Sequence, residues 1–253
     1  MSTETKTKTE TPITLTARTL HRALKAVSRA MSKPGDREHL ARVRLETFEV
    51  PGSSTGRVGL RSVATNGHWL ALFECELDGE TTIEAGRILD LGYDQVWEIE
   101  RHLRPFTKKS AADIEVTLSR KCFEMPGVTL LIRSCDELFP PYDKVIPTRP
   151  VFARRFGWVT VSADYIKTVA MTYKDADIGG FLMEVGTDES KSRDKKYDDL
   201  CPVVFFGESD CARLHCVLMP MRAERTELIL SEVRQQMRGG APTPEPEPVA
   251  LAA

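Results

Sequence analysis

Apolar and polar residues follow a pattern that repeats three times along the chain: a short strand, one helix and then several strands. In the first repeat, residues 13–15 alternate as in a strand, and Thr16 is a suitable N-cap for a helix ending near Ser32, before Pro34. The apolar face of this helix is formed by Leu20, Leu24, Val27 and Met31. Strands are then predicted over 41–50, 58–65 and 69–77.

The second and third repeats have the same order of elements. The second begins at 81–83, continues with a helix predicted from about Arg87 to Leu103, and has strands over 113–118, 121–123 and 128–134. The third begins at 157–161, with a helix from Ser162 through Tyr173 and strands over 180–185, 202–206 and 212–219. The repeats predict an α+β fold of strand–helix–strands units.

Both ends of the chain differ in composition from the repeats. Residues 1–11 are polar and rich in Thr, Lys and Glu, which predicts a disordered tail. After the last repeat, residues 223–238 carry a helical pattern of apolar and charged positions. Residues 239–253, in which Pro alternates with Thr or Glu from Pro242 to Pro248, are predicted to be a second disordered tail.

Composition excludes some classes of protein and leaves others open. The chain has 253 residues, of which 41% are hydrophobic and 28% charged, as in ordinary globular proteins. Its net charge of −2 means that any nucleic-acid site must arise from local segregation of charge. We find no signal peptide and no membrane-length apolar run, so we expect a cytoplasmic, nucleoid-associated protein without a membrane partner.

Candidate chemistry is sparse in this sequence. The six cysteines form no CxxC pair, which favours buried reduced thiols over a zinc site or a disulfide framework. The five histidines show no ligand spacing, and no phosphate-binding or nucleophile-elbow motif occurs. We therefore expect no enzyme activity, no catalytic residues, no metal and no cofactor.

The predicted first helix is strongly basic. No acidic residue occurs between Thr16 and Lys33, and the spacing of its cations places them in one stripe, opposite the apolar face. Such a stripe suits a continuous phosphate backbone, contacted without sequence readout. The candidate DNA contacts are Arg18, Arg22, Lys25, Arg29 and Lys33 here, Arg87, Arg101 and Arg104 in the second repeat, and Lys167 and Lys174 in the third. For the last two repeats, a plain solvated helix face is an equally good interpretation.

Three short segments carry a family resemblance. They read ATNGHWLA at 64–71, LFPPYDKVIP at 138–147 and CVLMPMR at 216–222. In this order they resemble the A-T-D-G-H-R-L-A, F-P-x-Y-x-x-V-[IL]-P and V-M-P-[MV]-R segments of the bacterial DNA polymerase III β sliding clamp family. The resemblance covers roughly residues 12–222. It implies the DNA-clamp fold, in which helices line a central channel and antiparallel sheets form the outside.

In that family the three segments converge on a pocket for short peptides of polymerases and other DNA-processing proteins. The resemblance assigns to this pocket Thr65, Gly67, His68, Trp69, Leu70, Pro140, Lys144, Val145, Val217, Met219, Pro220 and Met221. Two positions depart from the family pattern, because Asn66 replaces an Asp and Trp69 replaces an Arg. We expect Trp69 to add apolar surface to the pocket and to change its peptide preference.

The resemblance also implies a domain organisation and an assembly. Residues 12–147 correspond to one complete clamp domain of two units, and 148–222 to a partial domain of one unit. Clamp rings of this superfamily contain six two-unit domains, so four chains of three units fill one ring. A homotetramer is therefore favoured, and a trimer is next if residues 148–156 are the stub of a fourth unit. Neighbouring chains of a tetramer would meet through like surfaces.

Two functions remain open at this point. The first is a processivity factor that encircles duplex DNA, sequence-independently, and tethers a DNA polymerase or other proteins with clamp-binding motifs, with a clamp loader as a further candidate partner. The alternative is a clamp-like interaction protein that never closes a ring and regulates a full-length clamp or its partners. The missing units favour the alternative, and the basic first helix favours the ring.

Overall fold

The computed structural model describes residues 12–51, 56–77, 83–107, 114–133, 138–146, 161–185, 202–209 and 211–218. The tails predicted at 1–11 and 239–253, the helix predicted at 223–238 and the connector at 148–156 lie outside these residues. The division into domains at residues 147 and 222 therefore stays a prediction.

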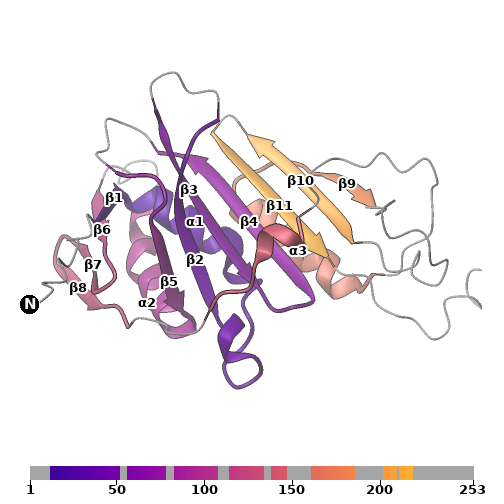
Figure 1. Cartoon of the computed structure of the whole chain (residues 1–253), viewed down its shortest axis with the longest axis horizontal. Helices are drawn as coiled ribbons and strands as arrows, with labels where there is room; N and C mark the ends of the chain where they lie inside the picture. The colour runs from indigo at the N-terminus through magenta and orange to yellow at the C-terminus, as the bar shows by residue number, and fades with distance from the viewer. Residues whose placement is uncertain are drawn as a thin grey trace, which may run out of the picture.

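Eleven strands of the described chain form two antiparallel sheets (Figure 1). The larger has the order β5-β2-β3-β4-β11-β10-β9, and the smaller has the order β1-β6-β7-β8. The strands are β1 Ile13–Thr16, β2 Arg42–Glu49, β3 Val58–Thr65, β4 Trp69–Glu76, β5 Ile88–Gly92, β6 Glu115–Leu118, β7 Cys122–Met125, β8 Val128–Leu131, β9 Leu182–Val185, β10 Val203–Ser209 and β11 Ala212–Leu218.

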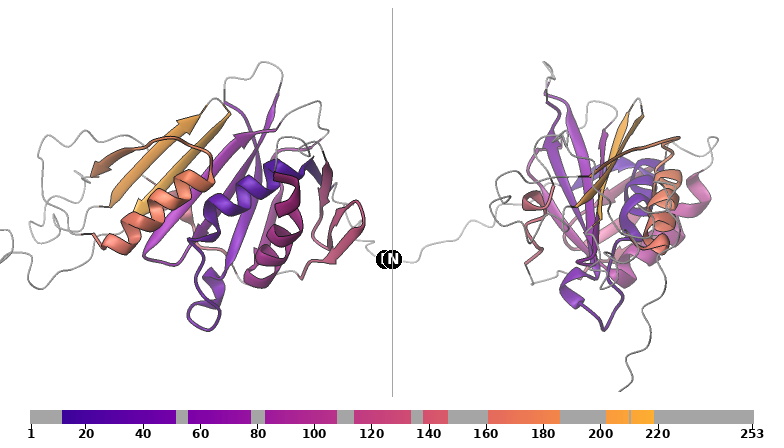
Figure 2. Two further views of the ribbon diagram at one scale, coloured as in Figure 1. Left: turned by 180° about the vertical axis from the view of Figure 1, so that it is seen from behind. Right: turned by 90° about the vertical axis from the view of Figure 1, so that its right-hand side faces the viewer.

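Three α-helices lie in a row on one face of the larger sheet. They are α1 Ala17–Ser28, α2 Tyr93–Leu103 and α3 Ala163–Asp175, with short 3-10 helices η1 Glu38–Leu40, η2 Arg104–Thr107 and η4 Tyr142–Lys144. The helix α1 lies in the middle and packs against both α2 and α3 (Figure 2). The basic helix predicted from the sequence is therefore the central one of this layer.

The first helix forms as its sequence predicts but ends earlier. The Thr16 hydroxyl accepts a hydrogen bond from the Thr19 amide at 3.2 Å, which caps the N-terminus. Its apolar side chains Leu20, Leu24 and Val27 are fully buried. The α-helix ends at Ser28 because the next residues form tighter turns, in which the Met31 amide bonds back to the Ser28 carbonyl.

The second helix begins later than predicted. The prediction from Arg87 was wrong, because residues 88–92 form β5 and α2 begins at Tyr93. In β5, Leu89 and Leu91 are buried and Ile88 is exposed, which is the period-two pattern of a strand. The Gln95 side chain accepts a hydrogen bond from the Gly92 amide at 3.0 Å, so the helix begins directly after the strand.

The first two repeats exchange their first strands. Strand β1 of the first repeat pairs with β6 of the second, and β5 of the second pairs with β2 of the first. Each repeat therefore completes the sheet of the other. The third repeat joins differently, because its last strand β11 pairs antiparallel with β4 and extends the larger sheet.

Two apolar clusters hold these layers together. The larger lies between the sheets and the helices and includes Trp69, Phe73 and Phe205. The smaller lies on the opposite face of the larger sheet, where Leu70, Leu72 and Val217 are covered from the 138–146 segment. The chain thus has a helix face and an outer sheet face, and the candidate sites divide between them.

Candidate partner cleft and DNA-facing helices

The outer sheet face brings together parts of all three family-like segments. Leu70 of β4 and Val217 of β11 are direct cross-strand partners, so their side chains lie on the same face. The segment 138–146 crosses this face (Figure 1), and Phe139 packs into the same small cluster. Segments from residue 64, residue 138 and residue 216 onward therefore meet at one place, as the resemblance implies.

Charged side chains anchor the crossing segment to the sheet. The Arg44 guanidinium stacks over the Phe139 ring at 4.6 Å and donates two hydrogen bonds to Asp90, at 2.8 and 2.9 Å. The Tyr142 hydroxyl donates to the Glu46 carboxylate at 2.5 Å. Burial and this hydrogen bond raise the pKa of Tyr142 to about 12, so the phenol keeps its proton even in alkaline solution near pH 10. Tyr142 is thus a fixed donor that fastens the segment to the sheet.

The turn between β3 and β4 is built around Gly67. Its φ of +83° is accessible to glycine at low cost, and a side chain there would collide with the guanidinium of Arg37. The Asn66 side-chain oxygen accepts from the amides of His68 at 2.9 Å and Trp69 at 3.1 Å. Asn66 therefore closes the turn by the hydrogen bonds that an Asp would also make.

Trp69 does not contribute to the outer face, contrary to our expectation. It is 2% exposed and lies in the larger cluster, on the helix side of the sheet. The physical reason is strand alternation, because Leu70 faces outward and its neighbour must face inward. The side chain cannot contact a peptide bound on the outer face, so Trp69 is a core residue.

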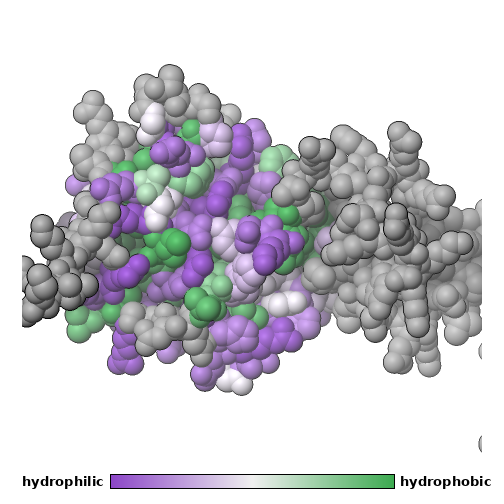
Figure 3. Space-filling view, viewed as in Figure 1, coloured by the Kyte–Doolittle hydropathy of each residue, from purple (hydrophilic) through white to green (hydrophobic). Residues whose placement is uncertain are grey.

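The remaining pocket candidates form a covered floor and an exposed rim. Leu70 and Val217 are 3% and 1% exposed, and Thr65 is buried with its hydroxyl bonded to the Trp69 carbonyl at 2.8 Å. The rim candidates are half-buried Pro140 and exposed Gly67, His68, Lys144 and Val145. Met219, Pro220 and Met221 lie outside the described residues. Figure 3 shows apolar and polar residues interspersed on this face.

On the helix face, Arg22 has a different role from the one predicted. Its guanidinium donates to the Ala176 carbonyl at 2.7 Å and the Ser209 hydroxyl at 3.2 Å, and lies 3.4 Å from the Cys211 sulfur. All three partners belong to the third repeat. Because its donors are used within the chain, Arg22 joins α1 to the third repeat and is a poor candidate for a phosphate contact.

Two other cations of the stripe share an acidic partner. Lys25 Nζ lies 3.1 Å from Asp175 Oδ1, and Arg29 Nη2 lies 2.9 Å from Asp175 Oδ2. Asp175 is the last residue of α3, so sequence reasoning limited to the first helix missed it. The stripe is therefore partly neutralised from the neighbouring helix. Arg18 and Lys33, near the two ends of the stripe, are exposed.

The other predicted DNA contacts are distributed unevenly. Arg87 was placed on a helix, but it precedes β5, where its amide bonds Thr47 and its side chain bonds Glu84 at 2.7 Å. Arg101 lies on α2, 3.5 Å from Glu98, and Arg104 is exposed at the start of η2. Lys167 and Lys174 are exposed on α3. All of them except Arg87 therefore belong to the helix layer.

Two titratable groups on the helix face have shifted pKa values that the sequence did not predict. Burial raises the pKa of Glu100, which is 8% exposed on α2, and the nearby cations of Lys25 and Arg29 oppose that shift. Burial lowers the pKa of His21 on α1, and the charge of Lys25 lowers it further. Burial thus disfavours the charged form of both groups. The described residues contain no cluster of His, Cys, Asp and Glu able to hold a metal ion.

Comparison with protein-family models and with curated protein sequences finds no match. Comparison with solved structures finds bacterial clamps. The C. crescentus β sliding clamp gives a TM-score of 0.60 at 17% identity, over 85% of this chain and 66% of that one. A DNA polymerase sliding clamp from Pseudomonas aeruginosa gives 0.59 at 18%, over 84% and 66%. This chain has the fold of the bacterial DNA polymerase III β sliding clamps.

A third sliding clamp, from Bartonella birtlesii and bound to griselimycin, gives a TM-score of 0.56 at 16% identity, over 84% of this chain and 66% of that one. The expected fold class, α+β with the DNA-clamp arrangement of units, is confirmed. The chain spans 66% of the length of these clamps. No helix in the described ranges is long and apolar enough to cross a membrane.

The cysteines of the clamp fold match the expectation only in part. Cys122, Cys211 and Cys216 are free, and Cys135 and Cys201 fall outside the described residues. Cys75 and Cys216 are buried as predicted, whereas Cys211 is exposed at the start of the β10–β11 return. Burial raises the pKa of the Cys216 thiol far above its ordinary value, so this thiol is unreactive.

Proposed function

We propose that this protein is a DNA sliding clamp: a ring of identical chains that encircles duplex DNA and tethers a polymerase or another DNA enzyme. The observation that supports it best is the clamp fold, with a basic helix at the centre of the helix layer. In a ring closed with the helices inward, that layer faces the phosphates. The protein needs no catalytic group, because a closed ring stays on DNA by topology and keeps its partner at high local concentration.

The charges of the helix layer suit mobile binding. The exposed cations on α1 and α3 are Lys and Arg on helix surfaces, which contact phosphates at long range or through water. Bidentate contacts to base edges would hold the ring at one sequence and stop it from sliding. Asp175 lowers the positive charge of α1, which weakens each contact and favours movement along the duplex.

The outer face supplies the partner site in this proposal. The 138–146 segment packs on the apolar cluster of Leu70 and Val217 and presents exposed Val145 and Lys144, which suit a short linear peptide with an apolar anchor. Partners bound there lie outside the ring and leave the channel open for DNA. One ring carries several such sites, one on each chain.

The DNA test uses topology. Protein assembled on a nicked circular plasmid should remain bound through gel filtration at about 0.2 M salt, where electrostatic binding is weakened. Cutting the plasmid once should release it, because a ring slides off a free end. Arg18→Glu with Lys33→Glu should reduce retention, and Arg57→Glu with Arg213→Glu, two exposed cations of the larger sheet away from the helix layer, is the matched control. Equal retention on cut and uncut DNA would contradict the ring.

The peptide test compares two exposed apolar residues. Val145 is 43% exposed at the rim and Ile88 is 46% exposed on β5. A fluorescent clamp-binding peptide should lose about 1–2 kcal/mol of binding free energy with Val145→Asp, and nothing measurable with Ile88→Asp. Loss of binding with both variants, or with neither, would place the peptide elsewhere.

A second candidate function is the non-ring interaction protein that regulates a clamp. The observation that favours it is that Arg22, Lys25 and Arg29 of the basic stripe are bonded within the chain, which leaves fewer cations for DNA. That protein would bind clamp-binding peptides with the same outer face but would not stay on circular DNA. The plasmid experiment therefore distinguishes the two functions.

A further inference from the structure

At the end of the molecule formed by α3 and β9, apolar side chains that face the core are exposed to solvent. Met183 on β9 is paired directly with Phe205 on β10, and the Phe205 side chain lies in the main core. Met183 therefore faces the same helix side, yet it is 62% exposed. Its neighbour Leu182 faces outward and is 74% exposed. Within the described chain, the core stops at β9 without a covering element.

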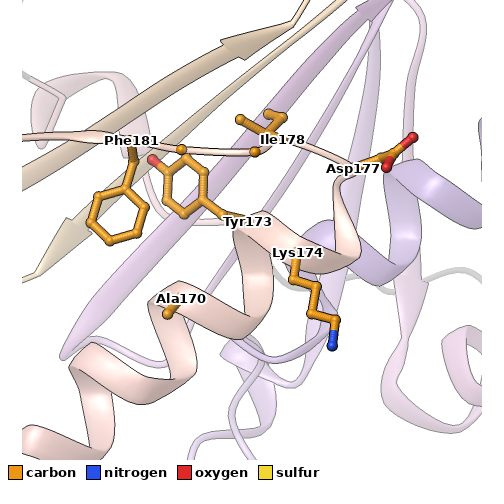
Figure 4. A pocket seen from close by; sticks show the side chains of 8 residues that line it. Ala170, Tyr173, Lys174, Asp177, Ile178 and Phe181 are labelled. Carbon is orange, nitrogen blue, oxygen red and sulfur yellow. The ribbon is translucent and has the colours of Figure 1, made fainter.

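A pocket lies between α3 and the chain that leads into β9 (Figure 4). Its volume is about 310 Å³, and its walls include the rings of Tyr173 and Phe181, whose centroids are 4.8 Å apart. Ala170 and Lys174, which line the pocket from α3, are exposed, and Phe181 is 39% exposed. The pocket, the exposed helix side and the strand edge form one continuous end, which we call the α3–β9 face.

The first two repeats show how this kind of end is completed. Strand β2 is the first strand after α1, as β9 is the first after α3, and each is the outermost of its repeat's three strands in the larger sheet. The outer edge of β2 carries β5, which comes from the other repeat. Likewise α1 packs against α2 of that repeat. Among the described residues, β9 pairs only with β10.

We propose that the α3–β9 face binds the α3–β9 face of a second copy of this chain about a two-fold axis. The contact deepens the proposed ring function and rests on it. Two third repeats then form one complete clamp domain, as the first and second repeats do within one chain. The two third repeats would be related by an exact two-fold axis, whereas the first and second repeats of one chain are related only approximately.

A second copy fits this face better than a peptide or DNA does. A linear peptide would cover the strand edge but not the exposed side of α3. The face carries both Lys174 and Asp177 beside the same pocket, so a two-fold contact can place opposite charges together. DNA is disfavoured because exposed apolar side chains such as Leu182 and Met183 dominate the edge.

With this contact, a ring can close with an even number of chains. The other end of the molecule is β8, the outer strand of the smaller sheet, where Leu131 is 82% exposed. Strand β8 holds the position in its sheet that β4 holds in the larger one, and β4 joins β11 antiparallel. Two β8 strands from neighbouring copies can pair in the same way. The two kinds of like-to-like contact alternate around a ring of four chains.

The experiment compares masses in solution by light scattering. The full-length chain with Leu182→Glu and Met183→Glu should have a mass near twice 28.3 kDa, where the wild type is near four times that value. Leu138→Glu is the matched control, because this leucine is 91% exposed and lies away from the α3–β9 face. It should leave the mass unchanged. Circular dichroism checks that both variants are folded.

Hydrogen exchange gives a readout that needs no variant. The backbone amides of 182–185 that point away from β10 should exchange slowly at concentrations where the wild type is assembled and quickly after dilution, whereas those of β3 should not change. A double variant that keeps the full mass, or amides of β9 unaffected by dilution, would overturn the α3–β9 contact and leave the ring function standing. A wild type that remains monomeric at micromolar concentration would overturn both.

Discussion

Strands β2 and β9 occupy matching positions in their repeats, but β2 is covered by neighbouring elements and β9 is largely exposed. The β2 side chains of Val43 and Leu45 are fully buried, because β5 covers the strand edge and α1 and α2 cover its inner face. On β9, Leu182 and Met183 are 74% and 62% exposed. The same unit is thus closed where a second unit faces it, and it is open at β9, where no described element does.

The comparison shows that one clamp unit cannot bury its own core. A strand edge with unpaired backbone groups and exposed apolar side chains is prone to pair with another chain, and proteins normally cover or charge such an edge. The first and second repeats solve this by exchanging strands. The third repeat keeps the problem, and an identical chain with the same open end can solve it for both copies.

The largest expected effect is a difference in stability between a substitution on β2 and one on β9. Leu45→Ala should lower the free energy of unfolding by about 2–5 kcal/mol, because it leaves a cavity in a closed core. Met183→Ala, at an open core, should change the stability of the single chain by less than about 0.5 kcal/mol. Thermal melts over a range of protein concentrations test this. Leu45→Ala should lower the melting temperature throughout, and Met183→Ala only where the wild type is assembled.

A smaller effect is expected at the junction between the two regions. Arg22→Ala removes the hydrogen bonds to Ala176 and Ser209 and should destabilise the chain by roughly 1–3 kcal/mol, since it leaves partly buried acceptors without this partner. Arg18→Ala, on the same helix and exposed, should cost nothing measurable in urea unfolding. If the two variants are equally stable and only Arg22→Ala loses DNA, the residue is a DNA contact after all.

Asp175→Asn should affect DNA binding more than folding. Its ion pairs with Lys25 and Arg29 are partly exposed and contribute less than about 1 kcal/mol to stability. Releasing both cations should tighten binding to duplex DNA and steepen its logarithmic salt dependence by up to about 2. Asp164→Asn, in the first turn of α3, is the control for a general loss of negative charge. An unchanged slope with Asp175→Asn would show that α1 does not meet phosphates.

The smallest effect is a pH dependence of stability. Burial lowers the pKa of both His21 and His215 in the folded chain, so the unfolded chain binds more protons near their ordinary pKa of 6.5. Their contribution to stability is therefore present above that value and is lost as the pH falls through the lowered values. Urea midpoints should decline from pH 7 toward pH 5.5, and His21→Gln with His215→Gln should flatten this decline. A decline equal to that of the wild type would exclude these two histidines as its cause.

Much of the fold could be predicted because the units have clear local signals. The Thr16 cap and the spacing of Leu20, Leu24 and Val27 predict α1 correctly except at its end. Strand β5 was missed because no proline and no Gly-Gly pair separates residues 88–92 from the helix that follows. The two elements therefore read as one helix. The alternation of β5 is visible only once Leu89 and Leu91 are known to be buried while Ile88 is exposed.

The candidate sites were less predictable because they depend on contacts distant in the sequence. The family-like segments led correctly to the meeting of Leu70 and Val217, but side-chain direction on β4 places Trp69 on the opposite face. The charge of the first helix could be read from its residues. Its neutralisation by Asp175 could not, because that residue lies 146 positions from Arg29.

The most direct test of the account is the mass of the wild-type chain in solution, measured by light scattering from low to high micromolar concentration. A mass near four times 28.3 kDa is expected, because chains of three units with like-to-like contacts close a six-domain ring at four copies. A mass near three times that value would contradict the like-to-like contacts and indicate a head-to-tail ring. A monomer at every concentration would contradict the ring itself.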